Sequence, residues 1–523
     1  MTDADGVRPL DGLGDPGDLD AAQLAGSGDM PSEVFRAAAH AMADRMADYL
    51  RDVEGRAVLP AVRPGELSAA LGGPVPAAPV PLDAILADVD ALVTPNVTHW
   101  QHPGFFAYFP SSASGPGILG EMLMSTLVAN AMLWRTSPVA TELEGVVVGW
   151  LRDALGLPAA FDGLLTDTAS TSSLTALAAA RQAATGDAAA AGIAGTAPLR
   201  IYASTEAHSS IEKAAMTLGI GRAGVRRIAT DGALAMDVAA LEAAIAEDRA
   251  AGWRPAAIVA TIGTTSSTAI DPVDAIADVA AREGLWLHVD AAYAGVVALI
   301  PERRAPFQGW QRADSIVVNP HKWLFTPLDC SLLLSRRLPV VRDAFSLVPE
   351  YLRTTGGASS GRDYNEYQPQ LGRRFRALKL WMVLRYFGID GLRSRIEEHI
   401  AMAARLADLI DADPDAERLA PAPFATVCFR WRPRRFAGRE ADPAVAARLD
   451  ALNEAVMARV NDSGEAFLSH TKLGGRYTIR LAIGSPRTEW RHVARAWDLV
   501  RAAGAELDVD AVASAPGSPP SGG

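Results

Sequence analysis

One short stretch, an apolar run that leads into a lysine, constrains this chain more than any other. Residues 316–318 read Ile-Val-Val, and their β-branched side chains predict a buried strand. Asn319 and Pro320 end the strand and place His321 and Lys322 at its carboxyl end, where open α/β sheets carry their chemistry. Trp, Leu and Phe follow, and such apolar neighbours should lower the pKa of the lysine amine and make it a nucleophile that can form a Schiff base. The alternative is a lysine at the edge of the core with its amine in water.

A second strand end upstream carries a carboxylate. Residues 286–289 read Trp-Leu-His-Val, and Asp290 follows with two alanines after it. A lysine that holds the aldehyde and a carboxylate that keeps the pyridine nitrogen protonated are the pair that pyridoxal phosphate requires. Ala292 would leave room for the flat ring. The two strand ends together therefore predict a pyridoxal-phosphate site.

The motifs around these two strands resemble a known family. VDAAYAG is followed about thirty residues later by NPHKW, and HPGFFAYFPSSAS, SPVATELE, AHSSIEKA, IVATIGTTS and QLGRRFRALKLW occur in the same order as in the family. The chain resembles the group II pyridoxal-phosphate decarboxylases from Met30 to Leu499, and most closely the aromatic-L-amino-acid decarboxylases. The resemblance implies a homodimeric fold-type I enzyme that uses pyridoxal 5'-phosphate to decarboxylate an L-amino acid.

The resemblance also implies roles for individual residues. Lys322 would carry the cofactor, Asp290 would pair with its ring nitrogen, and His208 would stack on the ring and touch the substrate carboxylate. The expected cofactor-binding residues are Thr168, Ala169, Ser170, His208, Thr265, Asp290, Asn319, His321 and Lys322.

The expected phosphate-binding residues lie where a strand gives way to a helix. Hydroxyl side chains and first-turn amides at such a place can bind a phosphate, although an ordinary Ser/Thr helix cap is the simpler interpretation. The chain departs from the family here: the family more often has Gly-Ser before the Ala-Ser and Glu after it, where Asp167, Thr168 and Thr171 stand.

Aromatic residues gather near the expected substrate end. Trp100, Phe105, Phe106 and Phe109 precede Ser111, which matches the family's substrate-contacting residue, and we expect Trp100, Phe109, Ser111 and His208 to contact substrate. Such a cluster is otherwise typical of a core. Gly372 falls where indole-accepting members keep a small residue. An aromatic substrate is therefore expected, with a decarboxylase of glutamate or diaminobutyrate, an aromatic aldehyde synthase and a non-catalytic cofactor-binding protein as alternatives.

Tyr351 heads a Gly- and Ser-rich loop at about the family's spacing after the lysine. A phenol delivered by a closing loop can protonate the substrate carbon while water is excluded. Related aldehyde synthases have phenylalanine at this place, so Tyr351 predicts an amine as the main product. The alternative is a tyrosine that only packs the loop.

Hydrophobic periodicity predicts the organisation of the 523 residues. Strands alternate with helices from about Leu164 to Leu334, which indicates a mostly parallel, doubly wound α/β sheet. Helical spacing predicts an N-terminal helical extension, which packs on the partner subunit in the family; the alternative is a helical hairpin that packs on its own chain. Alternating strands and helices near the end predict a small α+β domain. The expected segments are a disordered tail (1–30), the helical segment (31–110), the large cofactor-binding domain (111–395), the C-terminal domain (396–510) and a disordered tail (511–523).

Composition excludes several other classes of function. The formal net charge of −12, with no basic block, argues against nucleic acid and anionic membranes as partners. The two cysteines, Cys330 and Cys428, give neither a disulfide framework nor a metal-ligand spacing, and they fit a reducing cytoplasm. Residues 118–133 are nearly all apolar but too short to span a bilayer, so they predict a buried helix.

Overall fold

The computed structural model describes residues 19–347 and 361–513, which divide into two compact units. The small unit runs up to Phe105 and includes Arg459–Phe467, and the large unit holds the rest of the described chain. All named strands belong to the large unit. The chemistry expected at strand ends therefore belongs to the large unit as well.

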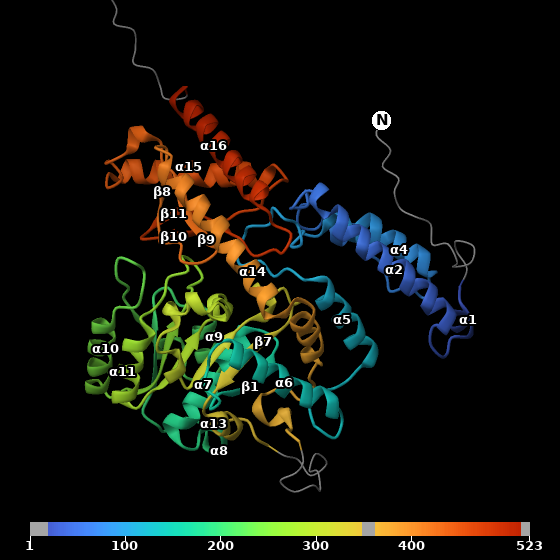
Figure 1. Ribbon diagram of the computed structural model, residues 1–523, viewed down its shortest axis with the longest axis horizontal. Helices are drawn as coiled ribbons and strands as arrows, with labels where there is room; N and C mark the ends of the chain where they lie inside the picture. The colour runs from blue at the N-terminus through green and yellow to red at the C-terminus, as the bar shows by residue number, and fades with distance from the viewer. Residues whose placement is uncertain (1–18, 348–360, 514–523) are drawn as a thin grey trace, which may run out of the picture. The chain divides into compact units, whose positions relative to one another are not determined.

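The small unit is helical. Its helices are α1 (Ala21–Ala25), α2 (Ser32–Asp52), α3 (Glu66–Leu71) and α4 (Leu82–Asp88). The Asp20 carboxylate caps α1 by accepting hydrogen bonds from two first-turn amides, so part of the tail expected to be disordered is helical. Arg45 of α2 pairs with Asp90, just beyond α4, at 2.9 Å, and the two helices lie side by side in Figure 1.

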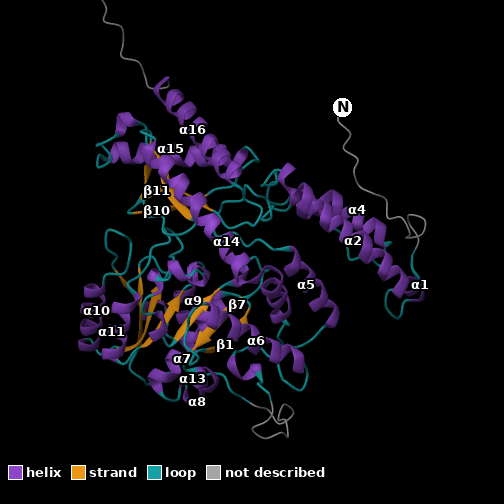
Figure 2. Cartoon of the chain, in the orientation of Figure 1, coloured by secondary structure: helices purple, strands orange, loops and turns teal. Residues whose placement is uncertain are grey.

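The large unit is built on a sheet of seven strands in the order β1-β7-β6-β5-β4-β2-β3 (Figure 2, orange). The strands are β1 (Asp162–Thr166), β2 (Leu199–Ser204), β3 (Val225–Ile228), β4 (Arg254–Thr261), β5 (Trp286–Asp290), β6 (Ser315–Val318) and β7 (Ser331–Ser335). Every pair from β6 to β3 is parallel, whereas β7 is antiparallel to both β6 and β1. The expected mostly parallel, doubly wound sheet is confirmed.

Helices precede, connect and follow these strands. They are α5 (Gly115–Leu127), α6 (Pro138–Ala154), α7 (Ala169–Thr185), α8 (Ala188–Ala191), α9 (Ser210–Thr217), α10 (Val238–Ala250), α11 (Val273–Glu283), α12 (Pro320–Trp323) and α13 (Leu338–Asp343). Helix α7 packs across β4 to β7 through a buried run at residues 176–180, four of them alanine. Small side chains let the helix approach the sheet closely. Helices α9 and α13 join α7 in one core, and α10 and α11 pack together (green in Figure 1).

A second, antiparallel sheet follows in the C-terminal part, in the order β10-β11-β9-β8. Its strands and helices are β8 (Ala416–Arg418), β9 (Thr426–Trp431), β10 (Ser469–Leu473), β11 (Arg476–Ala482), α14 (Arg376–Ala412), α15 (Pro443–Asp462) and α16 (Trp490–Ala513). This is the small α+β arrangement that the sequence predicts. The expected boundary between residues 395 and 396 falls inside α14, whose helical path is broken at Gly388 instead.

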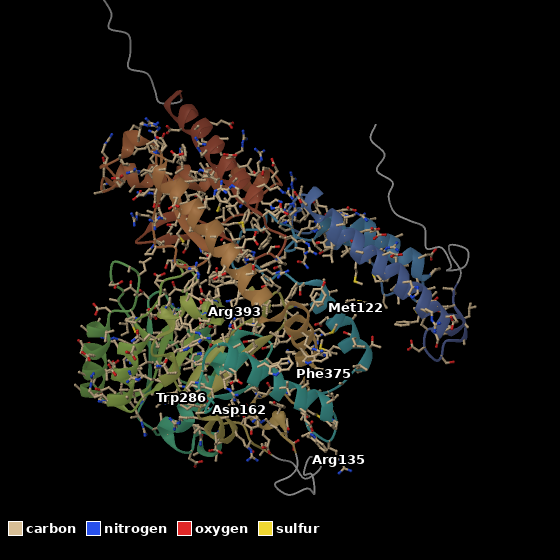
Figure 3. The ribbon with its side chains drawn as sticks, in the orientation of Figure 1. Met122, Arg135, Asp162, Trp286, Phe375 and Arg393 are labelled. Atoms are coloured by element: carbon tan, nitrogen blue, oxygen red, sulfur yellow. The ribbon has the colours of Figure 1, made fainter. Side chains whose placement is uncertain are left out.

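The prediction of a buried helix at residues 118–133 is wrong for the single chain. One face of α5 is open to solvent: Leu119 is 57% exposed, Leu127 is 55% exposed, and Met122, labelled in Figure 3, is 38% exposed. The opposite face packs on α14, where a methyl group on Gly120 would lie 2.7 Å from Lys379 Cα. Since nearly every residue of the run is apolar, its sequence does not distinguish the buried face from the exposed one. In the described ranges, we find no helix that is long and apolar enough to cross a membrane.

Candidate active site

The carboxyl edge of the large sheet gathers the expected site residues. Strand β5 ends at Asp290, β6 is followed directly by Asn319 and α12, and β2 leads into the turn that holds His208. These strands are parallel to one another, so their carboxyl ends meet at one edge. Asp162 and Trp286, labelled in Figure 3, begin β1 and β5 and mark the opposite, amino edge.

Lys322 lies in α12 with its side chain partly buried. Its Nζ is 5.1 Å from the centroid of the Phe109 ring. Burial lowers the pKa of the Lys322 amine below its usual value, the charge of Asp290 opposes this shift, and the charge of Arg480 adds to it. A larger fraction of the amine is therefore uncharged and nucleophilic at neutral pH than for an ordinary lysine.

Asp290 presents a buried carboxylate with unused hydrogen-bonding capacity. The residue is 7% exposed, and its Oδ1 accepts a hydrogen bond from the Ala292 amide at 3.1 Å. Within residues 19–347 and 361–513, its Oδ2 has no hydrogen-bond partner. A buried anion in this state favours a cationic N–H donor beside it.

His208 lies close enough to Asp290 and Lys322 for the charges of both to act on its imidazole. The imidazole is exposed at the surface, and its Nδ1 accepts a hydrogen bond from the Ser210 amide at 3.1 Å, which puts the proton of the neutral ring on Nε2. The protein atoms around the ring lower its pKa, Asp290 opposes this shift, and Lys322 adds to it. The structure thus brings His208, Asp290 and Lys322 within electrostatic reach of one another.

The amino end of α7 lies beyond the carboxyl end of β1. Thr168 is the N-cap residue, and its side chain makes no capping hydrogen bond to the helix, so the first-turn amides around Ala169 and Ser170 are left to other acceptors. Asp167 Oδ1 accepts a hydrogen bond from the Thr168 amide at 2.6 Å. The terminus therefore offers donors to a phosphate, but a carboxylate stands next to it.

Asn319 holds an unpaired polar atom beside this site. Cys330 N donates to His321 Nδ1 at 2.9 Å, so the proton of the neutral ring, whose pKa burial lowers to about 4, is on Nε2. That nitrogen lies 3.3 Å from Asn319 Nδ2, which is also a donor, while the buried Oδ1 of Asn319 has no partner. Exchanging the amide O and N pairs the histidine correctly and leaves a buried N–H of Asn319 for a ligand.

Four further residues are expected at the site: Thr265, Ser111, Trp100 and Tyr351. Thr265 lies on an exposed turn after β4, and Ser111 is partly buried two residues beyond Phe109. Trp100 belongs to the small unit, where its ring stacks on Phe105 with centroids 4.3 Å apart. Tyr351 lies outside the described residues. The cofactor contact of Thr265, the substrate contacts of Ser111 and Trp100, and the catalytic role of Tyr351 stay predictions.

Sequence reasoning missed Arg480 on β11. The residue is 4% exposed, its Nε donates to the Ser266 carbonyl at 2.7 Å, and its buried Nη2 has no hydrogen-bond partner. Its guanidinium carbon is 5.2 Å from the Phe109 ring centroid, close to the distance of Lys322 Nζ from the same ring. An arginine between an isoleucine and a leucine, at an inner position of a strand, was the signal that could have identified it.

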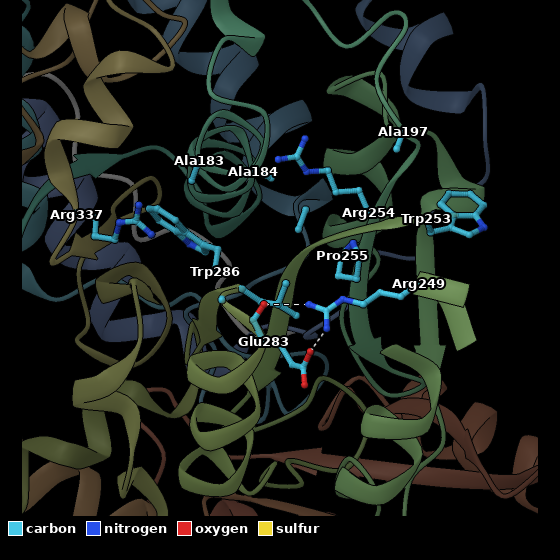
Figure 4. A pocket seen from close by; sticks show the side chains of 13 residues that line it. Ala183, Ala184, Ala197, Arg249, Trp253, Arg254, Pro255, Glu283, Trp286 and Arg337 are labelled. Carbon is cyan, nitrogen blue, oxygen red and sulfur yellow. Dashed lines mark hydrogen bonds and ion pairs between the residues drawn. The ribbon is translucent and has the colours of Figure 1, made fainter. Parts of the chain in front are cut away.

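A cavity of about 490 Å³ lies at the other edge of the sheet, where β4 and β5 begin (Figure 4). Arg249 pairs with the Glu283 carboxylate and donates to its backbone carbonyl at 3.1 Å, and the Arg337 guanidinium lies 5.0 Å from the Trp286 ring. Helices α10 and α11 end here, and arginine side chains stabilise the carbonyls at such ends. The residues that line this cavity include none of the expected site residues, so it is a separate feature.

The residues at the carboxyl edge fit pyridoxal phosphate. Asp290 offers a free carboxylate oxygen to the protonated ring nitrogen, α7 offers uncapped amides to the phosphate, and Lys322 offers an amine of lowered pKa to the aldehyde. The unpaired buried amide of Asn319 is a further group that a bound ligand would satisfy. Asp167 is the one feature that opposes the fit, because its charge lies near the expected phosphate.

Known proteins share this architecture over nearly its whole length. The chain is 39% identical over 490 residues to tryptophan decarboxylase 1 of Oryza sativa subsp. japonica, covering 91% of this chain and 95% of the relative. It is 40% identical over 481 residues to a phenylacetaldehyde synthase of Arabidopsis thaliana, covering 90% and 96%. The crystal structure of Oryza sativa TDC with PLP and tryptamine superposes with a TM-score of 0.87 at 38% identity, covering 92% of this chain and 99% of that chain. Residues 64–432 match the pyridoxal-dependent decarboxylase conserved domain, and the chain belongs to this family of pyridoxal-phosphate-dependent enzymes.

Proposed function

We propose that this protein decarboxylates an aromatic L-amino acid to the corresponding amine and carbon dioxide. The observation that carries the proposal is the position of the Lys322 amine, 5.1 Å from the Phe109 ring and within electrostatic reach of the buried Asp290 carboxylate. The amine has the lowered pKa that covalent attachment needs, and an aromatic ring stands beside it.

When bound, pyridoxal phosphate supplies an electron-accepting ring that takes up the electron pair left by the departing carboxylate. Lys322 would hold the aldehyde carbon, and Asp290 would keep a proton on the ring nitrogen through its free oxygen. The amides at the start of α7 would hold the phosphate, and His208 would cover the ring and meet the substrate carboxylate. Arg480 places a desolvated positive charge that helps to keep the Lys322 amine uncharged.

An aromatic side chain is the favoured substrate group. Phe109 stacks on Tyr293 with centroids 3.8 Å apart, which makes a flat apolar wall next to the amine. Gly372 is exposed in the single chain, and a methyl group added there would meet no atom within 4 Å, so this position neither supports nor opposes a bulky ring. Of the relatives named above, one is named for the decarboxylation of tryptophan and the other for the synthesis of phenylacetaldehyde, an aromatic aldehyde.

A panel of L-amino acids tests the proposal directly. Amine and carbon dioxide should form fastest with tryptophan, tyrosine or dihydroxyphenylalanine, measured at equal substrate concentration. A clear preference for glutamate or diaminobutyrate in competition would overturn the substrate class. Binding of the cofactor without carbon dioxide release from any substrate would instead indicate a non-catalytic binding protein.

Oxidative formation of an aldehyde is the second candidate, favoured by the similarity to a phenylacetaldehyde synthase. Tyr351, proposed to protonate the substrate carbon, favours the amine. The Tyr351→Phe variant should divert product to aldehyde, ammonia and peroxide while cofactor binding is kept. If the unmodified enzyme gives mostly aldehyde with stoichiometric peroxide, the protein is an aldehyde synthase.

We also propose that the enzyme is a homodimer whose partner covers α5. Leu123 and Leu127 are 45% and 55% exposed on this helix, and Val128 after it is 82% exposed, which is a large apolar surface for a free face. The Leu123→Asp/Leu127→Asp variant should sediment as a monomer, whereas Met216→Asp, at a 58% exposed position on α9, should not change the mass. A monomeric unmodified protein would refute the proposal.

A cytoplasmic location is proposed on the state of the two cysteines. Cys330 and Cys428 are both free and buried, and burial raises the pKa of the Cys330 thiol to about 12 and that of Cys428 to about 11. Free thiols are typical of reducing compartments. Fractionation of the source cells, with activity measured in each fraction, tests this location.

A further inference from the structure

Three aromatic rings from distant parts of the chain form one stack that begins at the Lys322 amine, and a fourth ring lies edge to edge with the last of them. Phe109 stacks on Tyr293 (3.8 Å between centroids, 13° between planes) and Tyr293 on Trp323 (4.9 Å, 2°), and the His399 imidazole is nearly parallel to the Trp323 ring with centroids 6.3 Å apart. The rings come from the segment before α5, the turn after β5, α12 and α14. Lys322 Nζ contacts the first ring of the stack, and the next residue along the chain supplies the third.

A hydrogen bond fixes the far end of the stack. Trp323 Nε1–H donates to His399 Nδ1 at 2.9 Å. An indole N–H can only donate, so Nδ1 holds a lone pair and the proton of the neutral imidazole is on Nε2, where the Ser485 backbone provides a partner. His399 is 3% exposed and Trp323 is 1% exposed, and Phe325 packs edge-on against the imidazole at 6.0 Å. Neither ring has room to rotate.

Lys322 needs such anchors because its own element is short. Helix α12 comprises only Pro320–Trp323, and an isolated helical turn has no stability of its own. The residue before the lysine is held by the hydrogen bond from Cys330 N to His321 Nδ1, and the residue after it by the bond from Trp323 to His399. The direction of the lysine side chain is therefore set by its two neighbours.

We propose that His399 is a positioning residue for the cofactor lysine: its Nδ1 lone pair holds the Trp323 indole, and the indole holds Lys322 Nζ against Phe109 and toward Asp290. This inference rests on the proposed role of Lys322. In the described chain, no hydrogen bond or ring contact joins His399 to the lysine or to an expected cofactor contact, so it would act through Trp323.

The reactivity of Lys322 in the protein without cofactor tests the proposal. Competitive acylation with acetic anhydride, followed by mass spectrometry, measures how readily each amine reacts as a function of pH. Lys472, exposed on β10, is the internal reference in the same molecule. The rate at which Lys322 is acylated depends on the environment of its amine and not on which reaction the enzyme performs. Failure of the proposed decarboxylation would therefore leave this test intact.

The variants separate positioning from general stability. His399→Leu removes the lone pair, and the rate of Lys322 labelling at pH 8 relative to Lys472 should fall about fivefold as the amine reaches water and its pKa rises toward the ordinary value. His399→Asn places an amide oxygen where Nδ1 stood, and it should keep most of the labelling rate. His470→Leu removes a different histidine that also lies against an aromatic ring, that of Tyr477 at 4.8 Å, and should leave Lys322 unchanged.

If His399→Leu does not fold, Trp323→Phe removes the same hydrogen bond from the donor side and must give the same loss. Unchanged labelling of Lys322 in a folded His399→Leu or Trp323→Phe protein would overturn the proposal. An equal loss in His399→Leu and His399→Asn would overturn it too, because the Nδ1 acceptor would then not matter.

Discussion

Lys322 is predicted to be the only lysine that the cofactor needs. Lys322→Ala should abolish the visible absorbance of the bound cofactor and all turnover, since no other amine lies between Phe109 and Asp290 in the described chain. The matched control is Lys472→Ala on exposed β10, which should keep both properties. A borohydride-stable adduct on another lysine in Lys322→Ala would refute this assignment.

Arg480 is predicted to act on that amine through its charge. Arg480→Met should raise the pKa of Lys322, so attachment of the cofactor to the protein, followed by absorbance, should require a higher pH. Arg480→Lys keeps the positive charge and should retain more of the original pH dependence. Arg476→Met, on the same strand with a side chain 42% exposed, is the control and should have no effect. Identical profiles for Arg480→Met and Arg476→Met would exclude the electrostatic role.

Some residues of the candidate site can be identified from the sequence, and others cannot. Lys322 and Asp290 each follow a recognisable strand, so a local pattern is sufficient to identify them. Arg480 and His399 come from β11 and α14, and only the packing of those elements brings them close to Phe109 and Trp323. A sequence pattern contains no information about that packing.

At the scale of elements, the amino end of α7 combines attraction and repulsion. The uncapped amides favour a phosphate, and the Asp167 carboxylate opposes it. Asp167→Asn keeps the acceptor for the Thr168 amide but removes the charge, and it should tighten cofactor binding by about 0.3–1 kcal/mol, or about two- to fivefold in Kd. Titration of the cofactor-free protein measures this change, and Asp187→Asn, just before α8, should show none. Weaker binding of the cofactor by Asp167→Asn would mean that the charge does not face the phosphate.

The break in α14 gives a second prediction for an element. Gly388 has φ 63° and ψ 167°, a conformation that other residues adopt only at a cost of about 1–3 kcal/mol. Gly388→Ala should therefore lower the free energy of unfolding by about that amount in urea titrations. Gly391→Ala, three residues further on in regular helix, should be neutral or slightly stabilising. Equal effects of the two substitutions would contradict the assigned strain.

The hydrophobic spacing within a segment was sufficient to predict whether it forms a helix or a strand. It did not predict strand direction or which face of a helix is exposed. The alternation of strands and helices that builds the large sheet follows from hydrophobic spacing alone. The antiparallel direction of β7 does not, because Ser-Leu-Leu-Leu-Ser reads equally well in either direction. The exposed face of α5 also has no signal in the sequence, because most residues of the helix are apolar and no described part of this chain covers that face.

At the scale of the whole molecule, three buried histidines make the protein sensitive to acid. Burial lowers the pKa values of His288, His321 and His399 to about 4. A histidine with a depressed pKa stabilises the fold fully above its unfolded value of 6.5, and this stability is lost as the pH falls toward 4. Asp271 acts in the opposite direction, because burial raises its pKa to about 6 and the folded protein binds its proton first.

The three histidines outweigh the single carboxyl. The free energy of unfolding should fall by roughly 2–3 kcal/mol per pH unit near pH 5. Calorimetry of the cofactor-free protein between pH 7 and 5 measures this as a falling Tm, and His399→Asn should reduce the slope by about half, because the opposing effect of Asp271 remains. A Tm that stays level or rises on acidification would show that the histidines are already charged in the folded state.

The order of the strands also sets when the protein can fold during synthesis. Strand β1 lies at the edge of the sheet and pairs only with β7, which ends at Ser335, so its partner is made about 170 residues later. At about 5–20 residues per second the ribosome needs roughly 10–30 s to supply that partner. Until then α7, which follows β1 and holds the expected phosphate contacts, has no complete sheet to pack on.

Nascent chains arrested before Ser331 should therefore be cleaved by protease between β1 and α7, and chains arrested well beyond Ser335 should be protected. Protection of the shorter chains would mean that β1 finds another partner first, and the cofactor could then meet its site before translation has finished.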